Sequence, residues 1–294
     1  CKKELKKAIE CCEHLGKTSD GMVIYLYQYQ GSSPLFRELG RLREIAFRAV
    51  GEGSGNRRDI DKYDMHYQHL VLWDEHALEL VGAYRLACAQ DVIEQHSQSG
   101  LYTDSLFNYT QDMTPYFKQG IELGRSFVQP KYWGRKSLDY LWYGIGAFIN
   151  RYPQYRYLFG AVSVSNALPE QAKSLLVHYY QHYYGCEKSL ATPNNAFRHT
   201  TDQQTQCTNL FEGNNIKEDF VELKHILANM GTHVPTLFKQ YTELCEPNGV
   251  KFLSFSIDPQ FNNCIDGLVL VDLEKVKPSK AKRYLGTDKS ASAS

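Results

Sequence analysis

Two ionised side chains, Glu122 and Arg125, interrupt an apolar stretch from Glu122 to Val128 that has the length and composition of a β-strand. A charge inside a run of Leu, Phe and Val must find a partner or a solvent-filled cleft, because burying it alone is costly. The pair therefore indicates a cleft whose wall carries both a carboxylate and a guanidinium.

A basic turn follows this strand, and a helix is expected directly after the turn, from Lys136 to Tyr152. The turn contains Lys131, Gly134, Arg135 and Lys136. The first N–H groups of a helix point out of its N-terminus and attract anions, so this arrangement suits a phosphate. An ordinary surface turn is the alternative, because one glycine falls short of a P-loop or a dinucleotide fingerprint.

Partners for the two strand charges are expected in two earlier segments, Asp59 to Asp64 and Gly82 to Leu86. The first segment supplies carboxylates and the second supplies Arg85, each next to apolar strand sequence. Charges from three separated segments suggest a network that is buried or lines a cleft. Salt bridges that only hold loops against the sheet remain the alternative reading.

Two other patterns do not support the chemistry that they first suggest. His178 and His182 stand four residues apart among tyrosines, but the glutamate of an HExxH metal motif is missing, so no metal site is expected. Ser163 and Ser165 lack the flanking glycines of a nucleophile elbow, which argues against a serine hydrolase.

The elements that would hold the charges alternate between strands and helices. Met22 to Tyr29 predicts a strand that leads into a helix, and two strand-like runs near Gln68 and Glu79 have hairpin spacing. Ala89 to Gln119 predicts an irregular cap. Further strands and helices follow, at 157–163, 169–185, 218–230, 235–245, 250–255 and 264–273.

Composition narrows the class of protein. The 33 basic and 33 acidic residues cancel, so nucleic acid is not an expected partner. No apolar run approaches the roughly 20 residues that span a bilayer. The eight cysteines show no CxxC pair, which favours reduced thiols in a cytoplasmic protein.

Three regions are expected along the chain. Residues 1–20 form a lysine-rich N-terminal segment in which Lys2 to Leu15 predicts an amphipathic helix, residues 21–275 form a single domain, and residues 276–294 form a basic, disordered tail. The lysines of both ends favour contact with an anionic membrane surface, and idle solvated ends are the alternative.

The successive charged motifs resemble those of the hemolysin-related, ornithine-lipid-type N-acyltransferases. The resemblance rests on Leu42-Arg43 with Phe47, on Asp61 to Asp64, on Leu80 to Leu86 and on Glu122 to Arg125, and it continues through Leu158 to Ser163, Asp258 to Phe261 and Asp266. The same pattern is more distantly similar to that of the acyl-homoserine-lactone synthases. This resemblance implies an α/β (α+β) GNAT-like fold, in which a mixed, V-splayed central sheet is flanked by helices and followed by additional C-terminal helices and strands.

The resemblance also implies a reaction and roles for individual residues. The enzyme would move a long-chain, optionally 3-hydroxy, fatty acyl group from acyl carrier protein to the α-amine of an amino acid such as ornithine, for aminolipid synthesis. Glu122 is the candidate base, with holding Arg125 as its alternative role, and Arg85 and Arg125 would pair with the carboxylate of the acceptor. Arg43, Asp61, Asp64 and Ser163 would shape the substrate cleft.

The expected donor is an acyl-4′-phosphopantetheine thioester and no cofactor is bound permanently. Lys131, Gly134, Arg135 and Lys136 would hold the pantetheine phosphate and the carrier protein. The turn lacks the second small residue of the pyrophosphate turn in acetyl-CoA-using relatives, which favours acidic acyl carrier protein over acyl-CoA. Catalysis would take place in the cytoplasm, at the inner membrane face. The alternatives are a non-catalytic lipid- or carrier-protein-binding relative and a signal synthase like those that make acyl-homoserine lactones.

Overall fold

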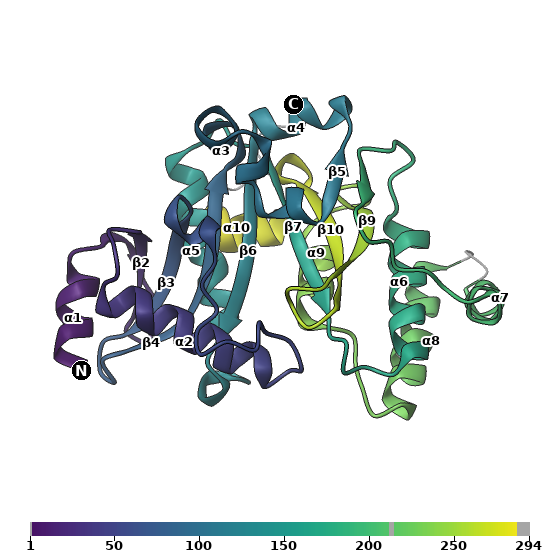
Figure 1. Cartoon of the computed structure of the whole chain (residues 1–294), viewed down its shortest axis with the longest axis horizontal. Helices are drawn as coiled ribbons and strands as arrows, with labels where there is room; N and C mark the ends of the chain where they lie inside the picture. Colours follow the sequence, from purple (N-terminus) through teal and green to yellow (C-terminus); the bar gives the residue numbers. More distant parts are fainter. Residues whose placement is uncertain (1, 212–214, 287–294) are drawn as a thin grey trace.

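An eight-stranded mixed sheet organises the chain, for which a computed structural model describes residues 2–211 and 215–286 (Figure 1). The strand order is β1-β2-β3-β4-β6-β7-β10-β9, and all neighbours are antiparallel except β6 and β7. The strands are β1 (Glu13–Lys17), β2 (Met22–Gln28), β3 (Gln68–Asp74), β4 (Glu79–Cys88), β6 (Gly120–Val128), β7 (Tyr157–Val164), β9 (Val250–Asp258) and β10 (Cys264–Asp272). The predicted mixed α/β architecture is confirmed.

The two parallel strands diverge, as the expected V-shaped sheet requires. The β6–β7 register runs only from Gly120 opposite Tyr157 to Glu122 opposite Phe159, although the strands continue to Val128 and Val164. The strands touch just beyond the last pair, where a Cβ added to Gly160 would lie 2.0 Å from the Leu123 carbonyl oxygen. Beyond that contact, no strand among the described residues pairs with the facing backbone groups of β6 and β7.

A β-bulge deforms β6 where it leaves β7. The register with β4 shifts between Ala83 and Arg85, so two residues of β6 occupy the place opposite one residue of β4. Arg125 lies in this bulge with a φ of 48°, a left-handed conformation that few side chains adopt. The bulge turns the Arg125 side chain out of the regular alternation of the strand.

Helices cover both faces of the N-terminal half of the sheet. α5 (Ser137–Arg151) packs on one face against Ile24, Leu70 and Leu72, whereas α2 (Pro34–Arg48) packs on the other against Val71 and Trp73. Alternate residues of β2 and β3 therefore enter opposite cores, as the two-residue period of a strand dictates. α1 (Lys2–Glu10) lies against α2.

The segment between β4 and β6 forms the expected irregular cap. It contains α3 (Ala89–His96), β5 (Phe107–Tyr109), α4 (Thr114–Lys118) and short 3₁₀ turns, and β5 pairs with β8 (Ala191–Pro193). Leu101, Phe107 and Met113 bury it against β7 and β10. The cap is therefore a packed layer that closes one face of the sheet at the point where the parallel strands meet.

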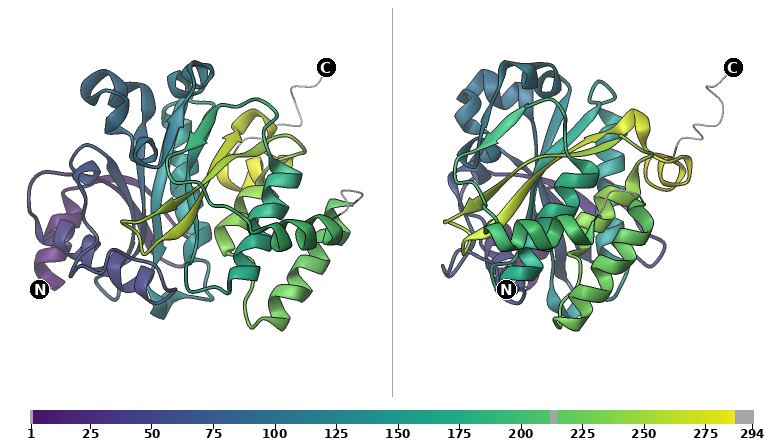
Figure 2. Two further views of the ribbon diagram at one scale, coloured as in Figure 1. Left: turned by 45° about the vertical axis from the view of Figure 1, so that its right-hand side comes forward. Right: turned by 90° about the vertical axis from the view of Figure 1, so that its right-hand side faces the viewer.

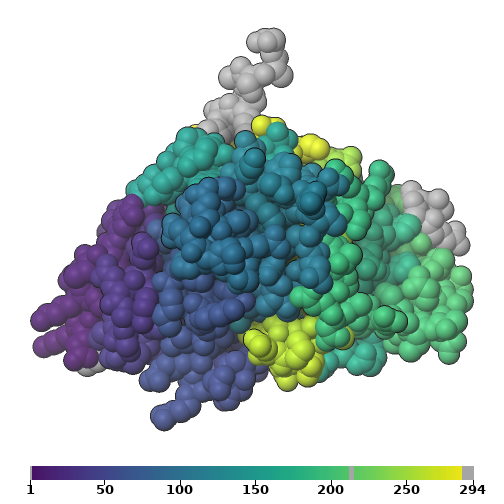
Figure 3. All heavy atoms as spheres, turned by 45° about the horizontal axis from the view of Figure 1, so that its top comes forward, coloured from purple at the N-terminus to yellow at the C-terminus, as the bar shows by residue number. Residues whose placement is uncertain are grey.

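Four helices follow β7; the first three lie beyond β9 on one side of the molecule, whereas the fourth lies behind the middle of the sheet, where Tyr241 packs against Trp142 of α5 (Figure 1 and Figure 2). They are α6 (Glu170–Tyr184), α7 (Thr201–Leu210), α8 (Ile216–Asn229) and α9 (Thr236–Leu244). The hairpin of β9 and β10 reaches back, and its tip contacts the segment after α2, where Asn262 Nδ2 donates to the Gly51 carbonyl at 2.8 Å (Figure 3). This contact brings together two segments that lie 211 residues apart in the sequence.

The structure differs from the sequence predictions at both ends. The N-terminal helix ends at Glu10, and Leu15 lies on the edge strand β1 and packs into the α5 side of the core. Residues 278–285 form α10 (Pro278–Leu285) instead of a disordered tail, because it packs on α5 so closely that a Cβ on Gly146 would lie 1.8 Å from the Tyr284 carbonyl oxygen. The rest of that expected tail, 287–294, lies outside the described residues.

Candidate active site

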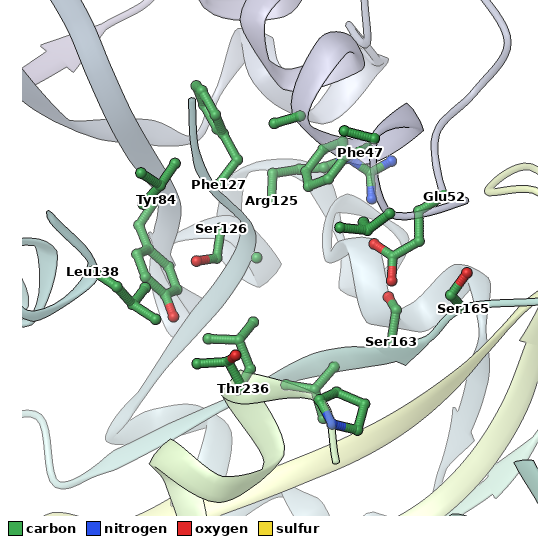
Figure 4. Close-up of a pocket in the computed structure, with 18 of the residues that line it drawn as sticks. Phe47, Glu52, Tyr84, Arg125, Ser126, Phe127, Leu138, Ser163, Ser165 and Thr236 are labelled. Carbon is green, nitrogen blue, oxygen red and sulfur yellow. The ribbon is translucent and has the colours of Figure 1, made fainter. Parts of the chain in front are cut away.

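A cavity of about 970 Å³ opens where β6 and β7 diverge (Figure 4). Residues 123–128 of β6 and 161–163 of β7 form two of its walls, and residues from α2, the start of α5 and the loop before α9 complete it. Most of the lining is apolar. The lining residues with acidic or basic side chains are Glu52, Arg125, Arg135, His233 and Asp266.

A charge network of three arginines and three aspartates lies beside the cavity. Arg43 Nε is 2.9 Å from Asp59 Oδ2 and its Nη1 is 2.7 Å from Asp64 Oδ1. Arg85 Nη1 contacts Asp61 at 2.6 Å and Asp64 at 3.0 Å. The predicted pairing of Arg85 with the acidic segment is therefore present, whereas Glu122 takes its hydrogen bonds from outside both predicted segments.

This network is buried and nearly neutral as a unit. Arg43, Arg85 and Asp64 are at most 1% exposed and are absent from the cavity lining. Burial opposes ionisation of Asp64, but the charges of Arg43 and Arg85 outweigh it and hold the pKa of that carboxyl well below its usual range. Arg43, Asp61, Asp64 and Arg85 thus support the cavity wall and do not reach the cavity.

Arg125 joins this network to the cavity. Its Nε lies 3.1 Å from Asp59 Oδ2 and its Nη2 lies 3.4 Å from Asp61 Oδ2. The guanidinium also packs over the rings of Tyr102 and Phe261, 4.6 and 4.7 Å from their centroids. Because Arg125 lines the cavity, it can present charge to an anionic group there.

Glu122 lies outside the cavity lining, at the last pair before the strands separate. It is 1% exposed; the Tyr67 hydroxyl donates to its Oε2 and the Thr103 N–H donates to its Oε1 at 2.8 Å. Burial raises the pKa of Glu122, which these hydrogen bonds only partly offset. Its contacts join β6 to the cap.

Two carboxyls that face the cavity carry no role in the sequence motifs. Asp266 on β10 is the cross-strand neighbour of Ser163 on β7, whose hydroxyl donates to Asp266 Oδ1 at 2.6 Å. The Glu52 side chain, from the loop after α2, points toward Ser163 across the cavity (Figure 4). Burial raises the pKa of Glu52 to about 8 and that of Asp266 to about 7.

The basic turn before α5 forms the other end of the cavity. Gly134 and Arg135 line it, together with Ser137 and Leu138 of the first helical turn. The N-cap residue of α5, Lys136, makes no side-chain hydrogen bond to the helix, so its first N–H groups are open to an anion. Lys131 pairs with Glu79, and neither Lys131 nor Lys136 is part of the lining.

The structure therefore separates the predicted site residues into two sets. Arg125, Ser163, Gly134 and Arg135 line one cavity, and the remaining predicted residues lie behind it or beside it. Sequence reasoning missed Glu52 and gave Asp266 no role, although a lone glutamate between Gly51 and Gly53 and an aspartate inside an apolar strand were visible signals. Across the described ranges, no cluster of His, Cys, Asp and Glu could hold a metal ion.

Comparison with known proteins agrees with this architecture. Residues 42–143 match the profile of the acetyltransferase (GNAT) domain. The chain is 30% identical over 274 residues to a glycine N(alpha)-acyltransferase of Phocaeicola vulgatus, covering 89% of this chain and 83% of that protein. It is 29% identical over 277 residues to a glycine N(alpha)-acyltransferase of Bacteroides thetaiotaomicron, covering 90% of this chain and 81% of the relative.

Other similarities are shorter or weaker. An L-ornithine N(alpha)-acyltransferase of Rhizobium meliloti is 31% identical over 146 residues, which cover 47% of this chain and 48% of that protein. Among solved structures, the acyl-homoserine-lactone synthase LasI matches with a TM-score of 0.43 at 9% identity, covering 92% of this chain and 96% of the synthase. Taken with the sequence identity over most of its length, the divergent sheet and its cavity show that this chain is an acyltransferase of the GNAT-fold N(alpha)-acyltransferase family, which includes the glycine and L-ornithine enzymes.

Proposed function

We propose that this enzyme moves a long-chain fatty acyl group from the phosphopantetheine arm of acyl carrier protein to the α-amine of glycine. The observation that carries the proposal is a single cavity with an arginine and two carboxyls at one end and an open helix N-terminus at the other. The extent of similarity to the two glycine enzymes supports glycine over ornithine, the acceptor that the sequence motifs first suggested.

The donor would enter along the gap between β6 and β7. Its phosphate would lie against Arg135 and the first N–H groups of α5, where the helix dipole favours negative charge. The thioester carbonyl would then lie among the backbone groups that β6 no longer shares with β7. An N–H group on that open edge can stabilise the oxyanion of the tetrahedral intermediate.

The acyl chain would occupy the apolar part of the cavity. Phe47, Val50 and Phe127 line it from one side, and Val162 and Leu237 line it from the other. Each methylene that leaves water for such a surface contributes about 0.8 kcal/mol. A cavity of about 970 Å³ accommodates a ligand of this size.

The acceptor would bind as a zwitterion at the end that holds Arg125. The guanidinium would pair with the acceptor carboxylate, while Asp59 and Asp61 hold Arg125 in place. In the reaction the amine nitrogen forms a bond to the acyl carbon, the C–S bond breaks, and the sulfur leaves as a thiol that carries the proton lost by the nitrogen.

The sequence also favours catalysis at the inner, cytoplasmic face of a membrane, since the product is a lipid. No helix in the described part of the chain is long and apolar enough to cross a bilayer. The apolar side of α1 packs against α2, so attachment would depend on exposed charges such as Lys3 and Lys7 and would be salt-sensitive. Co-sedimentation with anionic vesicles at low and high salt measures it.

The proposed function is tested with purified protein, palmitoyl-acyl carrier protein and a panel of acceptors at equal concentration. We expect N-palmitoylglycine as the main product, with slower acylation of ornithine and of larger amino acids. Faster acylation of ornithine would overturn the choice of glycine. Binding of the donor without acylation of any amino acid would favour a non-catalytic relative and overturn the proposal, and hydrolysis of the donor alone would overturn it by identifying a thioesterase.

A further inference from the structure

Two carboxyl groups that line the cavity do not belong to the charged motifs of β4 and β6. Glu52 belongs to the loop after α2, and Asp266 to β10, more than two hundred residues later in the chain. Both line the cavity between the divergent strands. Figure 4 shows the Glu52 carboxyl beside Ser163, and the Ser163 hydroxyl donates to Asp266. We infer that Glu52 and Asp266 receive the ammonium group of the acceptor and take up its proton before the nitrogen attacks the thioester; the inference rests on the proposed function.

The loop that carries Glu52 is held rigidly. Glu44, 3% exposed, accepts hydrogen bonds from the Ser54 N–H at 3.2 Å, the Ser54 hydroxyl at 2.8 Å and the Gly55 N–H at 2.9 Å. Gly51 adopts a φ of 78° and lies so close to the β7–α6 loop that an added Cβ would be 2.6 Å from Ala167 Cβ. These contacts keep Glu52 over the cavity.

The position of Asp266 is also fixed by its contacts. It lies directly opposite Ser163 in the β7–β10 register, is 1% exposed, and accepts the hydrogen bond of Ser163. Its neighbour in the next strand is Ser256. No arginine or lysine among the described residues forms an ion pair with Asp266 or Glu52, unlike the aspartates of the neighbouring network.

Glu52 and Asp266 are suited to exchange a proton near neutral pH. Glu52 and Asp266 interact electrostatically with each other. Their other titratable or charged neighbours are Cys264 of β10, Asp258 of β9, Arg125 of β6 and Tyr102 of the cap. Burial and the repulsion between carboxyls raise both pKa values to about 7 or 8, and Arg125 only partly lowers them. A base with a pKa near the working pH is the most effective proton acceptor.

The proton balance of the step is simple. The acceptor ammonium gives one proton to a carboxylate of the pair and becomes a neutral amine, which forms the C–N bond. As the tetrahedral intermediate collapses, the C–S bond breaks, the nitrogen loses its second proton, and the departing thiolate takes up that proton and leaves as the thiol. Arg125 would hold the acceptor carboxylate throughout, so the zwitterion is bound at both of its charges.

The same carboxyls predict an unusual stability effect. Because the folded-state pKa of Glu52 lies above its unfolded value, the folded protein binds more protons, and stability falls as the pH rises from about 4 through about 8. Glu52→Gln removes that loss. This variant should therefore be at least as stable as the wild type at pH 8, although it lacks the base.

The test measures kcat/KM for glycine between pH 6 and pH 9.5 together with thermal melting, using the full chain and palmitoyl-acyl carrier protein. The variants are Glu52→Gln, Glu52→Asp and Asp266→Asn, and the control is Glu94→Gln, an exposed carboxylate outside the cavity. We expect the wild-type rate to rise with an inflection between about 7 and 8, following the pKa values of Glu52 and Asp266. In Glu52→Gln, kcat/KM should fall at least about a hundredfold and the inflection should disappear. Glu52→Asp should recover part of the rate.

Each outcome separates the two claims. Transfer by the wild type with an unchanged rate and pH profile in Glu52→Gln and Asp266→Asn would overturn the inference and leave the proposed function intact. Parallel loss of melting temperature and rate in both variants would also overturn it, because it would show a structural role. Absence of transfer by the wild type would overturn the proposed function, and the inference with it.

Discussion

Arg125 Nε lies 3.1 Å from Asp59 Oδ2, so the guanidinium that faces the cavity is held from behind by a carboxylate that the cavity does not reach. The left-handed backbone of Arg125 in the β6 bulge makes this position available. The arrangement predicts that Arg125 orients a bound anion and is itself fixed before substrate arrives.

Arg125→Lys should raise the KM for glycine by about tenfold to a hundredfold, because an ammonium cannot pair bidentately with the acceptor carboxylate. The KM for glycinamide, which lacks that carboxylate, should change much less. Steady-state kinetics with both acceptors test this, with Arg41→Lys, an exposed arginine paired with Glu38, as the control. Equal losses with the two acceptors would show that Arg125 only supports the fold.

Glu122→Gln should keep kcat within about tenfold of the wild type and lower stability by about 1 kcal/mol, because an amide can still accept from the Thr103 N–H but no longer accepts from the Tyr67 hydroxyl. Urea unfolding and turnover, measured on the same preparation, test this. A loss of about a hundredfold in turnover with unchanged unfolding would instead identify Glu122 as the base, the role that the sequence motifs first suggested.

Arg43→Met should lower the free energy of unfolding at pH 7 by about 3 to 5 kcal/mol, since it leaves buried carboxylates without a partner. Arg43 and its neighbours depress the pKa values of Asp59 and Asp64 against the effect of burial. Their contribution is therefore complete above the unfolded value of about 4 and is lost as the pH falls below it.

The difference between wild type and Arg43→Met should accordingly shrink in urea titrations at pH 4 and pH 3. Arg41→Met is the matched control, because Arg41 is on the same helix but exposed. A difference of constant size across the pH range would mean that lost packing, and not charge, accounts for the effect.

Acyl transfer from acyl carrier protein should be faster than from acyl-CoA at equal donor concentration. Arg135→Glu should raise the KM for the carrier-protein donor by about tenfold or more, with the effect weakening at high salt, because Arg135 lines the donor end of the cavity. Lys188→Glu, at an exposed lysine outside the cavity lining, should leave both donors unaffected. Equal or better use of acyl-CoA would refute the preference for carrier protein.

Local pattern was enough to predict most of the strands, whereas the divergence of the sheet was implied only by the family resemblance. The charge of Arg125 inside an apolar strand correctly predicted a buried network with the acidic segment, since such a group cannot be left unpaired. For Glu122 the predicted partners were wrong, because Tyr67 and Thr103 satisfy its carboxylate. The sequence pattern could not show which charged residues belong to the buried network and which line the cavity, because this depends on the direction in which the bulge at Arg125 turns its side chain. α7, whose polar sequence has no apolar stripe, was not predicted either.

The Glu52–Asp266 pair shows where sequence reasoning ends. Each carboxyl taken alone fits an ordinary loop or strand, and only the return of the β9–β10 hairpin to the segment after α2 brings them together. The N-terminal helix was predicted to be too long for a related reason. The apolar spacing of Leu15 fits either a helix or an edge strand, and pairing with β2 selects the strand.

The most direct test of the account is tandem mass spectrometry of the lipids of cells that express this chain, compared with cells that express Glu52→Gln. The account predicts N-acylglycine species with long acyl chains in the first extract and their loss from the second, at equal amounts of folded protein. Extracts without any N-acylated amino acid in either culture would contradict it.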